Sequence, residues 1–255
     1  MLKALIIAIT VLTWNTGRMG EFKKPEQNEV LQYLLSQDAD VICLQEVDVY
    51  KDAKYLTLPD VKQTLSTKYP YSYLDFSVYD KRHQYGTMVW AKYPLIHKQS
   101  IRYETQGNLS NRCDIVVGHD TIRLINNHLE SYKLVSGDLT DVDRIEAKWK
   151  RATPLRNAQA RVVRREIDQS PYPVIVVGDF NSVALSYAYW HISSGLHDAW
   201  NETHCFWEWG STYEYKGIGL RIDYILCSDP LKPTACTVEE ISGSDHKPVV
   251  ATLVW

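Results

Sequence analysis

Paired cysteines are missing from this chain of 255 residues, although it contains five cysteines in all. No two of them form a Cys-x-x-Cys pair, and four lie in or beside apolar runs. Structural zinc sites and disulfide frameworks both depend on paired or regularly spaced cysteines. We therefore expect neither, and we predict that these four cysteines are buried free thiols.

A strong charge and a long apolar run are also lacking. The formal net charge of −3 gives no long-range attraction to nucleic acid, so any polyanion must be bound by a local patch. The apolar residues 2–9 are too short to span a bilayer, and they run into Thr13, Trp14 and Asn15 without a small-residue cleavage site. We predict a buried first strand and no transmembrane span, which favours the cytoplasm. The alternative is an N-terminal membrane anchor or export signal that is absent from this chain.

Three common nucleotide-binding and catalytic motifs are absent. The sequence has no Gly-x-Ser-x-Gly motif, no P-loop and no dinucleotide fingerprint, which argues against serine hydrolases, P-loop enzymes and Rossmann-type oxidoreductases. Repeats, low-complexity stretches and linkers are absent too, and a chain of this length can form one large core. We expect a single domain over residues 1–255 that acts as a monomer.

Apolar runs of strand length recur along the chain, and many end in a polar residue on their C-terminal side. We predict strands at residues 4–14, 40–45, 71–77, 85–91, 113–117, 121–127, 173–178, 222–227 and 248–254. Residues 117–121 are typical of a hairpin between two of these strands. Helical patterns fill some of the gaps without strict alternation of strand and helix. This arrangement indicates an α+β fold with antiparallel or mixed sheets.

Two helices are predicted from apolar stripes that follow a proline. The first begins near Pro25, and the second takes Thr153 as its N-cap and Pro154 as its first residue. The second helix carries a basic face that consists of Arg156, Arg161, Arg164 and Arg165. A charged helix face is most often solvated, and we prefer that interpretation to phosphate binding. The polar residues 136–152 are typical of an insertion or a lid.

Two polar residues close apolar strands in the N-terminal part of the chain. Glu46 ends one such run, and a carboxylate there is costly unless it is exposed or paired with a cation. Mg²⁺ keeps several waters and phosphate oxygens, so a single Glu suffices for a magnesium site. Asn15 ends the first strand, and its amide is suited to ligate a metal or to hold a carboxylate. Taken alone, each residue is more simply explained as a salt-bridged strand end or a turn residue.

A second group of polar residues follows two central strands. Asp179 and Asn181 lie two residues apart after an apolar run and a glycine, so one can orient a water while the other donates to a phosphoryl oxygen. His128 ends another strand, with Ser131 three residues further on, and a histidine donor stabilises charge in a phosphorane-like transition state. A turn rich in Asx residues and a structural histidine are the simpler explanations for either motif alone.

The C-terminal end of the chain adds a histidine between carboxylates. Asp245 precedes His246 directly, and Asp223 lies nearby in sequence. Carboxylates beside a histidine fix its tautomer and raise its basicity. Taken together, the polar clusters predict one active site in which a metal assists the in-line attack of water on a phosphate ester.

These motifs occur in a characteristic order, which is Thr-Trp-Asn15, Leu-Gln-Glu46, Asn-His128-Leu-Glu-Ser, Gly-Asp179-Phe-Asn181, Arg-Ile-Asp223-Tyr and Ser-Asp245-His246. In this order, and over nearly the whole chain, they resemble the endonuclease/exonuclease/phosphatase superfamily. The resemblance implies a four-layer α/β/β/α sandwich, in which two packed mixed β-sheets are flanked by helices. It also implies that the active site lies at one end of the sandwich.

The resemblance implies a metal site and a phosphate site. Glu46 would hold Mg²⁺ or Mn²⁺, helped by Asn15 and Asp245. Asn181 and His128 would contact the phosphate of the substrate.

The resemblance implies roles for the remaining catalytic residues as well. Asp179 would orient or deprotonate the attacking water. His246, supported by Asp223, would stabilise the transition state or take part in proton transfer. Because every catalytic position is present, an inactive member that serves only as a binding scaffold is disfavoured.

Within the superfamily, the His-Leu-Glu-Ser motif is similar to that of the 5′-tyrosyl-DNA phosphodiesterases, which implies that Ser131 reaches a phosphate oxygen. That branch carries an Arg shortly after the Gly-Asp-x-Asn motif, where this chain has residues 182–184, Ser-Val-Ala. We favour a nucleic-acid substrate of the 5′-end or DNA-adduct type, contacted by Ser131 and Arg112. The alternative is a phospholipid or small-molecule phosphoesterase that acts on sphingomyelin, inositol phosphates or sugar phosphates.

Aromatic residues crowd the segment 200–215, directly before the Asp223 motif. They include Phe206, Trp207, Trp209, Tyr213 and Tyr215. Such side chains stack on bases, enter a lipid interface or pack beneath a loop. We favour packing, with base stacking next.

Overall fold

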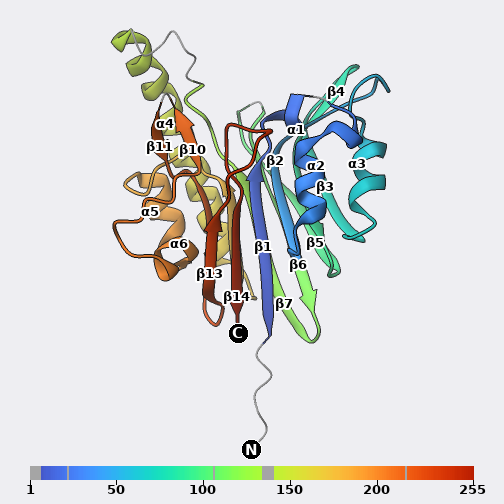
Figure 1. Cartoon of the computed structure of the whole chain (residues 1–255). Helices are drawn as coiled ribbons and strands as arrows, with labels where there is room; N and C mark the ends of the chain where they lie inside the picture. Colours follow the sequence, from blue (N-terminus) through green and yellow to red (C-terminus); the bar gives the residue numbers. More distant parts are fainter. Residues whose placement is uncertain (1–6, 22, 106, 134–140, 216) are drawn as a thin grey trace, which may run out of the picture.

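The computed structural model describes residues 7–21, 23–105, 107–133, 141–215 and 217–255. Two mixed six-stranded sheets lie face to face, and helices cover both outer sides (Figure 1). The predicted α+β sandwich of two packed mixed sheets flanked by helices is confirmed. None of the helices within the described ranges is both long enough and apolar enough to cross a membrane.

The first sheet has the strand order β13 (Lys232–Val238), β14 (Val249–Val254), β1 (Ala8–Asn15), β2 (Val41–Tyr50), β4 (His83–Ala91) and β3 (Tyr71–Tyr79). The second sheet has the order β5 (Leu95–Arg102), β6 (Leu109–Val117), β7 (Asp120–His128), β8 (Val174–Asp179), β12 (Asp223–Cys227) and β9 (His197–Asp198). A separate hairpin consists of β10 (Tyr213–Tyr215) and β11 (Ile218–Leu220).

The helices divide between the two sides of the sandwich (Figure 1). On one side lie α1 (Gly17–Glu21), the 3₁₀ turn η1 (Pro25–Gln27), α2 (Glu29–Ser36) and α3 (Leu58–Leu65). On the other side lie α4 (Val142–Asp168), α5 (Tyr187–Ser193) and α6 (Ala199–Thr203).

Three apolar clusters separate the layers of the sandwich. The central cluster joins the inner faces of the two sheets, with Val11 and Val89 from the first sheet and Ile115 and Val177 from the second. The outer clusters lie between the first sheet and α2–α3, and between the second sheet and α4–α5. Central strands such as β2 and β8 are therefore covered on both faces, which explains the apolar runs 41–44 and 174–177 with which they begin.

Each sheet contains a parallel strand pair that ends in polar residues. In the first sheet β1 runs parallel to β2, and the register pairs Asn15 with Gln45. In the second sheet β7 runs parallel to β8, and the register pairs His128 with Asp179. The carboxyl ends of parallel strands meet at one edge of a sheet, so each pair delivers its polar residues to one place.

The predicted hairpin at residues 117–121 is confirmed, because β6 and β7 join through Gly118 and His119 with Val117 opposite Asp120. The predicted first strand begins later than expected, at Ala8, and its residues 4–6 lie outside the described residues. The helix expected from Pro25 begins at Glu29, because Asn28 caps it by accepting from the Leu31 backbone.

The prediction that a helix begins at Thr153 is wrong. Helix α4 begins at Val142, where the Asp141 side chain caps it, and it runs through Pro154 to Asp168. A proline inside a helix lacks the N–H donor and crowds the carbonyl four residues earlier, which favours a helix start there, but α4 continues through Pro154. The segment expected to be an insertion or lid is therefore helical from residue 142 onward, and its residues 136–140 lie outside the described residues.

The basic face of α4 is only partly solvated, contrary to expectation. Arg161 and Arg165 are exposed, whereas Arg156 is 1% exposed. Arg156 points away from solvent because its guanidinium lies over the ring of Tyr132, at 4.0 Å from the ring centroid.

Gly178 determines how β8 approaches β7. It has a φ of +118°, and a Cβ atom at this position would lie 2.1 Å from the Asn127 carbonyl oxygen. We expect Gly178→Ala to lower the free energy of unfolding by about 3 kcal/mol or more, since backbone strain and overpacking both contribute. Gly195 is a matched control, because its φ is +72° but no atom lies within 4 Å of the added Cβ. Gly195→Ala should cost only about 1–2 kcal/mol. Urea denaturation measures both, and equal losses would contradict the steric argument.

Candidate active site

One side-chain amide links the two sheets at the end where the parallel pairs finish. Asn15 Nδ2 donates to Glu46 Oε1 at 3.2 Å and to Asp179 Oδ2 at 2.9 Å. Glu46 belongs to the first sheet and Asp179 to the second, so a shared donor holds the two carboxylates near one another. The backbone N–H of Gly17 donates to Asn15 Oδ1 at 3.1 Å, which fixes the amide. In this orientation Asn15 holds carboxylates rather than offering its oxygen to a metal.

Glu46 lies in a β-bulge of β2, where the pairing with β4 shifts between Leu44 and Val47. Its φ of +50° is left-handed, a conformation that costs a non-glycine residue about 1–3 kcal/mol and is concentrated at functional sites. The bulge directs the carboxylate toward His128, whose Nε2 lies 3.4 Å from Glu46 Oε1. Burial raises the pKa of Glu46, but the contact with His128 outweighs it and lowers the pKa to about 2. Glu46 is therefore ionised at neutral pH.

The pKa of His128 shifts in the opposite direction to that of Glu46. Burial lowers the pKa of His128, but the Glu46 carboxylate raises it by more, so the net shift is upward. His128 and Glu46 thus stabilise one another in their charged forms.

Asp179 is the last residue of β8 and is buried. It accepts from Asn15 Nδ2 at 2.9 Å, from Asn181 Nδ2 at 2.9 Å and from the Asn181 backbone N–H at 2.7 Å. Asn181 Nδ2 also donates to the Leu129 carbonyl at 3.0 Å, so both of its hydrogens are engaged. Burial and the charge of Asp223 raise the pKa of Asp179 to about 6. A carboxyl group whose pKa lies near neutrality is suited to accept a proton.

His246 faces Asp179 from the segment before β14. Its Nδ1 lies 2.9 Å from Asp223 Oδ2, and its Nε2 lies 3.9 Å from Asp179 Oδ2. Burial lowers the pKa of His246, but the charges of Asp223 and Asp179 outweigh it and raise the pKa to about 10. His246 is therefore an imidazolium at neutral pH. The gap to Asp179 is longer than a hydrogen bond, so a substrate oxygen beside it can contact both groups.

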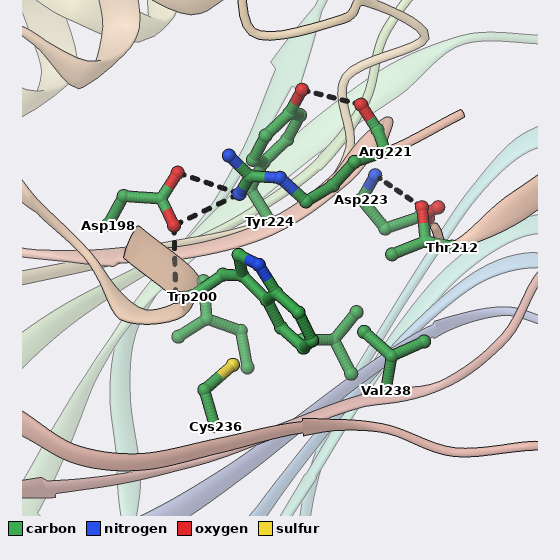
Figure 2. A pocket seen from close by; sticks show the side chains of 10 residues that line it. Asp198, Trp200, Thr212, Arg221, Asp223, Tyr224, Cys236 and Val238 are labelled. Atoms are coloured by element: carbon green, nitrogen blue, oxygen red, sulfur yellow. Dashed lines mark hydrogen bonds and ion pairs between the residues drawn. The ribbon is translucent and has the colours of Figure 1, made fainter. Parts of the chain in front are cut away.

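A small pocket behind Asp223 shows how this carboxylate is supported (Figure 2). The Asp223 backbone N–H donates to Thr212 Oγ1 at 3.1 Å, and Arg221 Nη1 pairs with Asp198 Oδ2 at 2.9 Å. Tyr224 Oη donates to the Arg221 carbonyl at 2.7 Å. These contacts fix the start of β12, from which Asp223 projects. Asp223 Oδ1 has no hydrogen-bond partner among the described residues.

Two sets of side chains are candidates to hold a metal ion. Ligand atoms of Asp179, Asp223 and His246 all lie within 4.8 Å of one another. However, His246 is an imidazolium at neutral pH, so this set could ligate an ion only after His246 loses the proton on Nε2. Glu46 is ionised and lines a cavity together with Asp245. Mg²⁺ keeps several waters and prefers such open carboxylates, so the chemistry of Glu46 and Asp245 fits Mg²⁺ better.

A cavity of about 650 Å³ opens onto this cluster. Six of the predicted site residues line it, which are Glu46, Ser131, Asp179, Asn181, Asp245 and His246. Its remaining wall is mostly aromatic or aliphatic and includes Tyr132, Trp149, Leu185, Tyr213, Tyr215 and Leu220. Lys133 is the one lysine or arginine among the described residues that line it. The cavity thus suits a short ligand with few phosphates and an attached apolar or aromatic group better than a long polyanion.

The other predicted residues lie behind the wall or elsewhere. Asn15, His128 and Asp223 are buried and contact the lining residues directly. The structure does not bring Arg112 to the cavity, because its Nε lies 3.0 Å from Glu166 Oε2 on α4 and its guanidinium also contacts Gln99.

The aromatic segment divides into two parts. Tyr213 and Tyr215 line the cavity, and the ring centroid of Tyr213 lies 4.7 Å from that of His246. Phe206 is 94% exposed, and Trp207 and Trp209 are exposed as well, so the packing expected for these three is wrong. They lie on the connection between α6 and β10, which does not fold back onto the core. Tyr132 and Trp149 were not predicted to line the site, since neither belongs to a recognisable motif.

Comparison with known proteins identifies the family of the chain. Residues 12–246 match the Endonuclease/Exonuclease/phosphatase family, and the chain belongs to this family of phosphoesterases. No curated protein sequence matches the chain significantly.

Several solved structures share the fold. An endonuclease/exonuclease/phosphatase from Beutenbergia cavernae aligns with a TM-score of 0.71 at 15% identity, over 96% of this chain and 71% of the other. Truncated TDP2 from Caenorhabditis elegans aligns with a TM-score of 0.68 at 20% identity, over 97% and 98% of the two chains. ANGEL2, a 2′,3′-cyclic phosphatase, aligns with a TM-score of 0.68 at 16% identity, over 98% and 95%. At these identities the likenesses show the fold alone.

The Asp223 carboxylate should control the titration of His246. In the metal-free protein, the NMR signals of His246 should show an imidazolium through neutral pH, because its pKa is raised to about 10. Asp223→Asn removes the largest of the raising influences, so the midpoint should move down toward the ordinary histidine range. Asp229→Asn, an exposed and distant change, is the control. An unchanged midpoint in Asp223→Asn would contradict the coupling.

Proposed function

We propose that the protein is a divalent-metal-dependent phosphodiesterase that hydrolyses a phosphate ester in nucleic acid, at a 5′ end or a DNA adduct. One observation carries this proposal. Asp179 and His246 face each other across 3.9 Å, beside the ionised Glu46. A proton acceptor, a cationic donor and a metal-binding carboxylate are the groups that phosphate-ester hydrolysis requires.

Glu46 and Asp245 would hold Mg²⁺ or Mn²⁺, and Asn15 would fix the Glu46 carboxylate. When bound, such an ion neutralises negative charge on the phosphate oxygens. The low pKa of Glu46 supports this assignment, because a metal ligand must be deprotonated.

Asp179 and His246 would have different roles in proton transfer, because their pKa values differ. Asp179, with a pKa near 6, would accept the proton of the attacking water. His246 is already protonated at neutral pH, so it would donate its Nε2–H to a phosphate oxygen rather than act as the base. Ser131 would donate to another phosphate oxygen from the cavity wall. Asn181 would chiefly hold Asp179, since both of its amide hydrogens are engaged.

Glu46→Gln tests the metal site. This variant keeps the shape of the side chain but loses its charge, and we expect it to lose most Mg²⁺-dependent turnover while remaining folded. Glu26→Gln, on the exposed turn η1, is the matched control and should behave like the wild type. Steady-state rates over a magnesium titration, with circular dichroism for folding, measure the effect. Undiminished hydrolysis by the wild type in excess chelator would refute metal dependence.

Asp179→Asn and His246→Ala test the acid–base pair. Each should lower kcat by at least ~100-fold, the usual scale for losing a general base or a transition-state donor. KM should change much less, because these groups act mainly in the transition state. A variant with a near-normal kcat on its best substrate would show that the assigned role is wrong.

The substrate class rests on two observations. The His-Leu-Glu-Ser motif is similar to that of the 5′-tyrosyl-DNA phosphodiesterases, and Ser131 lines the cavity. ANGEL2 has been solved with adenosine-2′,3′-vanadate, which supports nucleotide substrates in this fold. The aromatic and aliphatic wall of the cavity favours a second candidate function, the hydrolysis of small apolar phosphodiesters or phospholipids.

Salt dependence separates a strand-end substrate from long duplex DNA. Lys133 and the His246 imidazolium are the cations among the described lining residues, which predicts few phosphate contacts. Each contact contributes about −0.9 to the slope of log K against log salt on duplex DNA, so the slope should be shallow. Rates on single-stranded DNA, abasic duplex, 5′-phosphotyrosyl DNA, sphingomyelin and inositol phosphates should be highest for 5′-end substrates. A steep slope together with efficient internal cutting of duplex would contradict the proposal.

A further inference from the structure

Arg156 on α4 is a buried cation that the proposed reaction does not use. Its side chain is 1% exposed, and neither Nη atom has a hydrogen-bond partner among the described residues. A buried charge without a partner destabilises a fold, so such a group is retained chiefly where it serves a ligand or a network.

The guanidinium lies directly behind the cavity wall. The ring of Tyr132, which lines the cavity, covers it at 4.0 Å from the ring centroid to Cζ. Trp149, another lining residue, packs against the Tyr132 ring, and the two ring centroids lie 6.1 Å apart. Burial lowers the pKa of Arg156, and the Tyr132 side chain, followed by the charges of Asp179 and Glu130, opposes this effect.

Neither of these carboxylates forms a hydrogen bond with an Nη atom of Arg156. Glu130 Oε1 pairs with Arg151 Nη1 at 2.7 Å, and Asp179 is occupied by Asn15 and Asn181. The Arg156 guanidinium therefore presents its two Nη groups as a planar fork of unused donors, and the Tyr132 ring covers it. Such a fork matches two oxygens of a phosphate group.

We propose that Arg156 binds a second phosphate of the substrate, adjacent to the scissile one, and that the Tyr132 ring covers it in the free protein. This inference rests on the proposed function. The scissile phosphate would contact the His246 imidazolium, which lines the cavity, so the guanidinium of Arg156 is left for a neighbouring phosphate. Tyr132 lies in an irregular segment after β7, and rotation of its side chain would uncover the fork.

Calorimetric titration with two nucleotides tests the second phosphate directly. Thymidine 5′-monophosphate and thymidine 3′,5′-bisphosphate, titrated in Mg²⁺ buffer, differ only in that phosphate. The wild type should bind the bisphosphate about 10- to 100-fold more tightly, the range expected for hydrogen bonds to a charged group. Arg156→Met should reduce this preference to about threefold or less. Arg161→Met, on the exposed face of the same helix, should retain it.

A thermal melt distinguishes ligand binding from a structural role. Methionine removes an unpaired buried charge and keeps much of the side-chain volume, so Arg156→Met should be at least as stable as the wild type. Glu130 Oε2 also lacks a partner among the described residues, and a solvent bridge from it to Arg156 would instead make the variant less stable. Tyr132→Ala uncovers the guanidinium and should keep or increase the preference for the bisphosphate.

Four results would overturn the inference. They are a wild type with no preference, an Arg156→Met variant with an unchanged preference, a Tyr132→Ala variant without any preference, and failure of both nucleotides to bind. Turnover of the 4-nitrophenyl ester of thymidine 5′-phosphate is measured separately. Its absence would contradict the proposed function, while the ratio of the two affinities would still test Arg156.

Discussion

The amide of Asn15 is the contact on which the geometry of the active site depends. It donates to a carboxylate from each sheet, and so it holds Glu46 and Asp179 together although their charges repel. Directly beneath it, Gln45 Nε2 donates to Asn126 Oδ1 at 2.7 Å, which ties the same two sheets through their buried interior. Paired polar groups of this kind fix the position of one sheet relative to the other, whereas an apolar core alone tolerates sliding.

This constraint allows strain and charge to be concentrated at one end of the sandwich. Glu46 and Asn181 both have left-handed backbones, with φ values of +50° and +49°. The apolar clusters on either side of each sheet stabilise the fold enough to offset that strain. Glu46, Asp179 and His246 also have widely different pKa values, because burial and neighbouring charges act on each of them in different proportions. Groups whose pKa values are driven apart are the usual sign of divided acid–base roles.

The sequence was informative where strands are buried on both faces. Strands β2 and β8 begin with continuous apolar runs, and the polar residues that follow each run mark the end of the sandwich where the site lies. The edge strands β5 and β13 were not predicted, because most of their residues are exposed or half-buried and no apolar run marks them. The start of α4 was misplaced because Pro154 resembles a helix start, whereas the Asp141 cap lies upstream.

Side-chain partners could not be predicted from the sequence in the same way. Arg112 and Arg156 look alike as isolated basic residues, yet Glu166 engages the first and the ring of Tyr132 covers the second. These differences depend on which faces of β6 and α4 meet other elements, and tertiary packing decides that.

The position of a bound Mn²⁺ ion tests the central claim most directly, because the two candidate sets of ligands have no residue in common. Crystals of the protein soaked in Mn²⁺ would locate the ion by its anomalous scattering. The account predicts a single strong peak at Glu46, with Asp245 near it and the Asp223–His246 hydrogen bond intact. A peak bound by Asp179, Asp223 and His246 instead would contradict it.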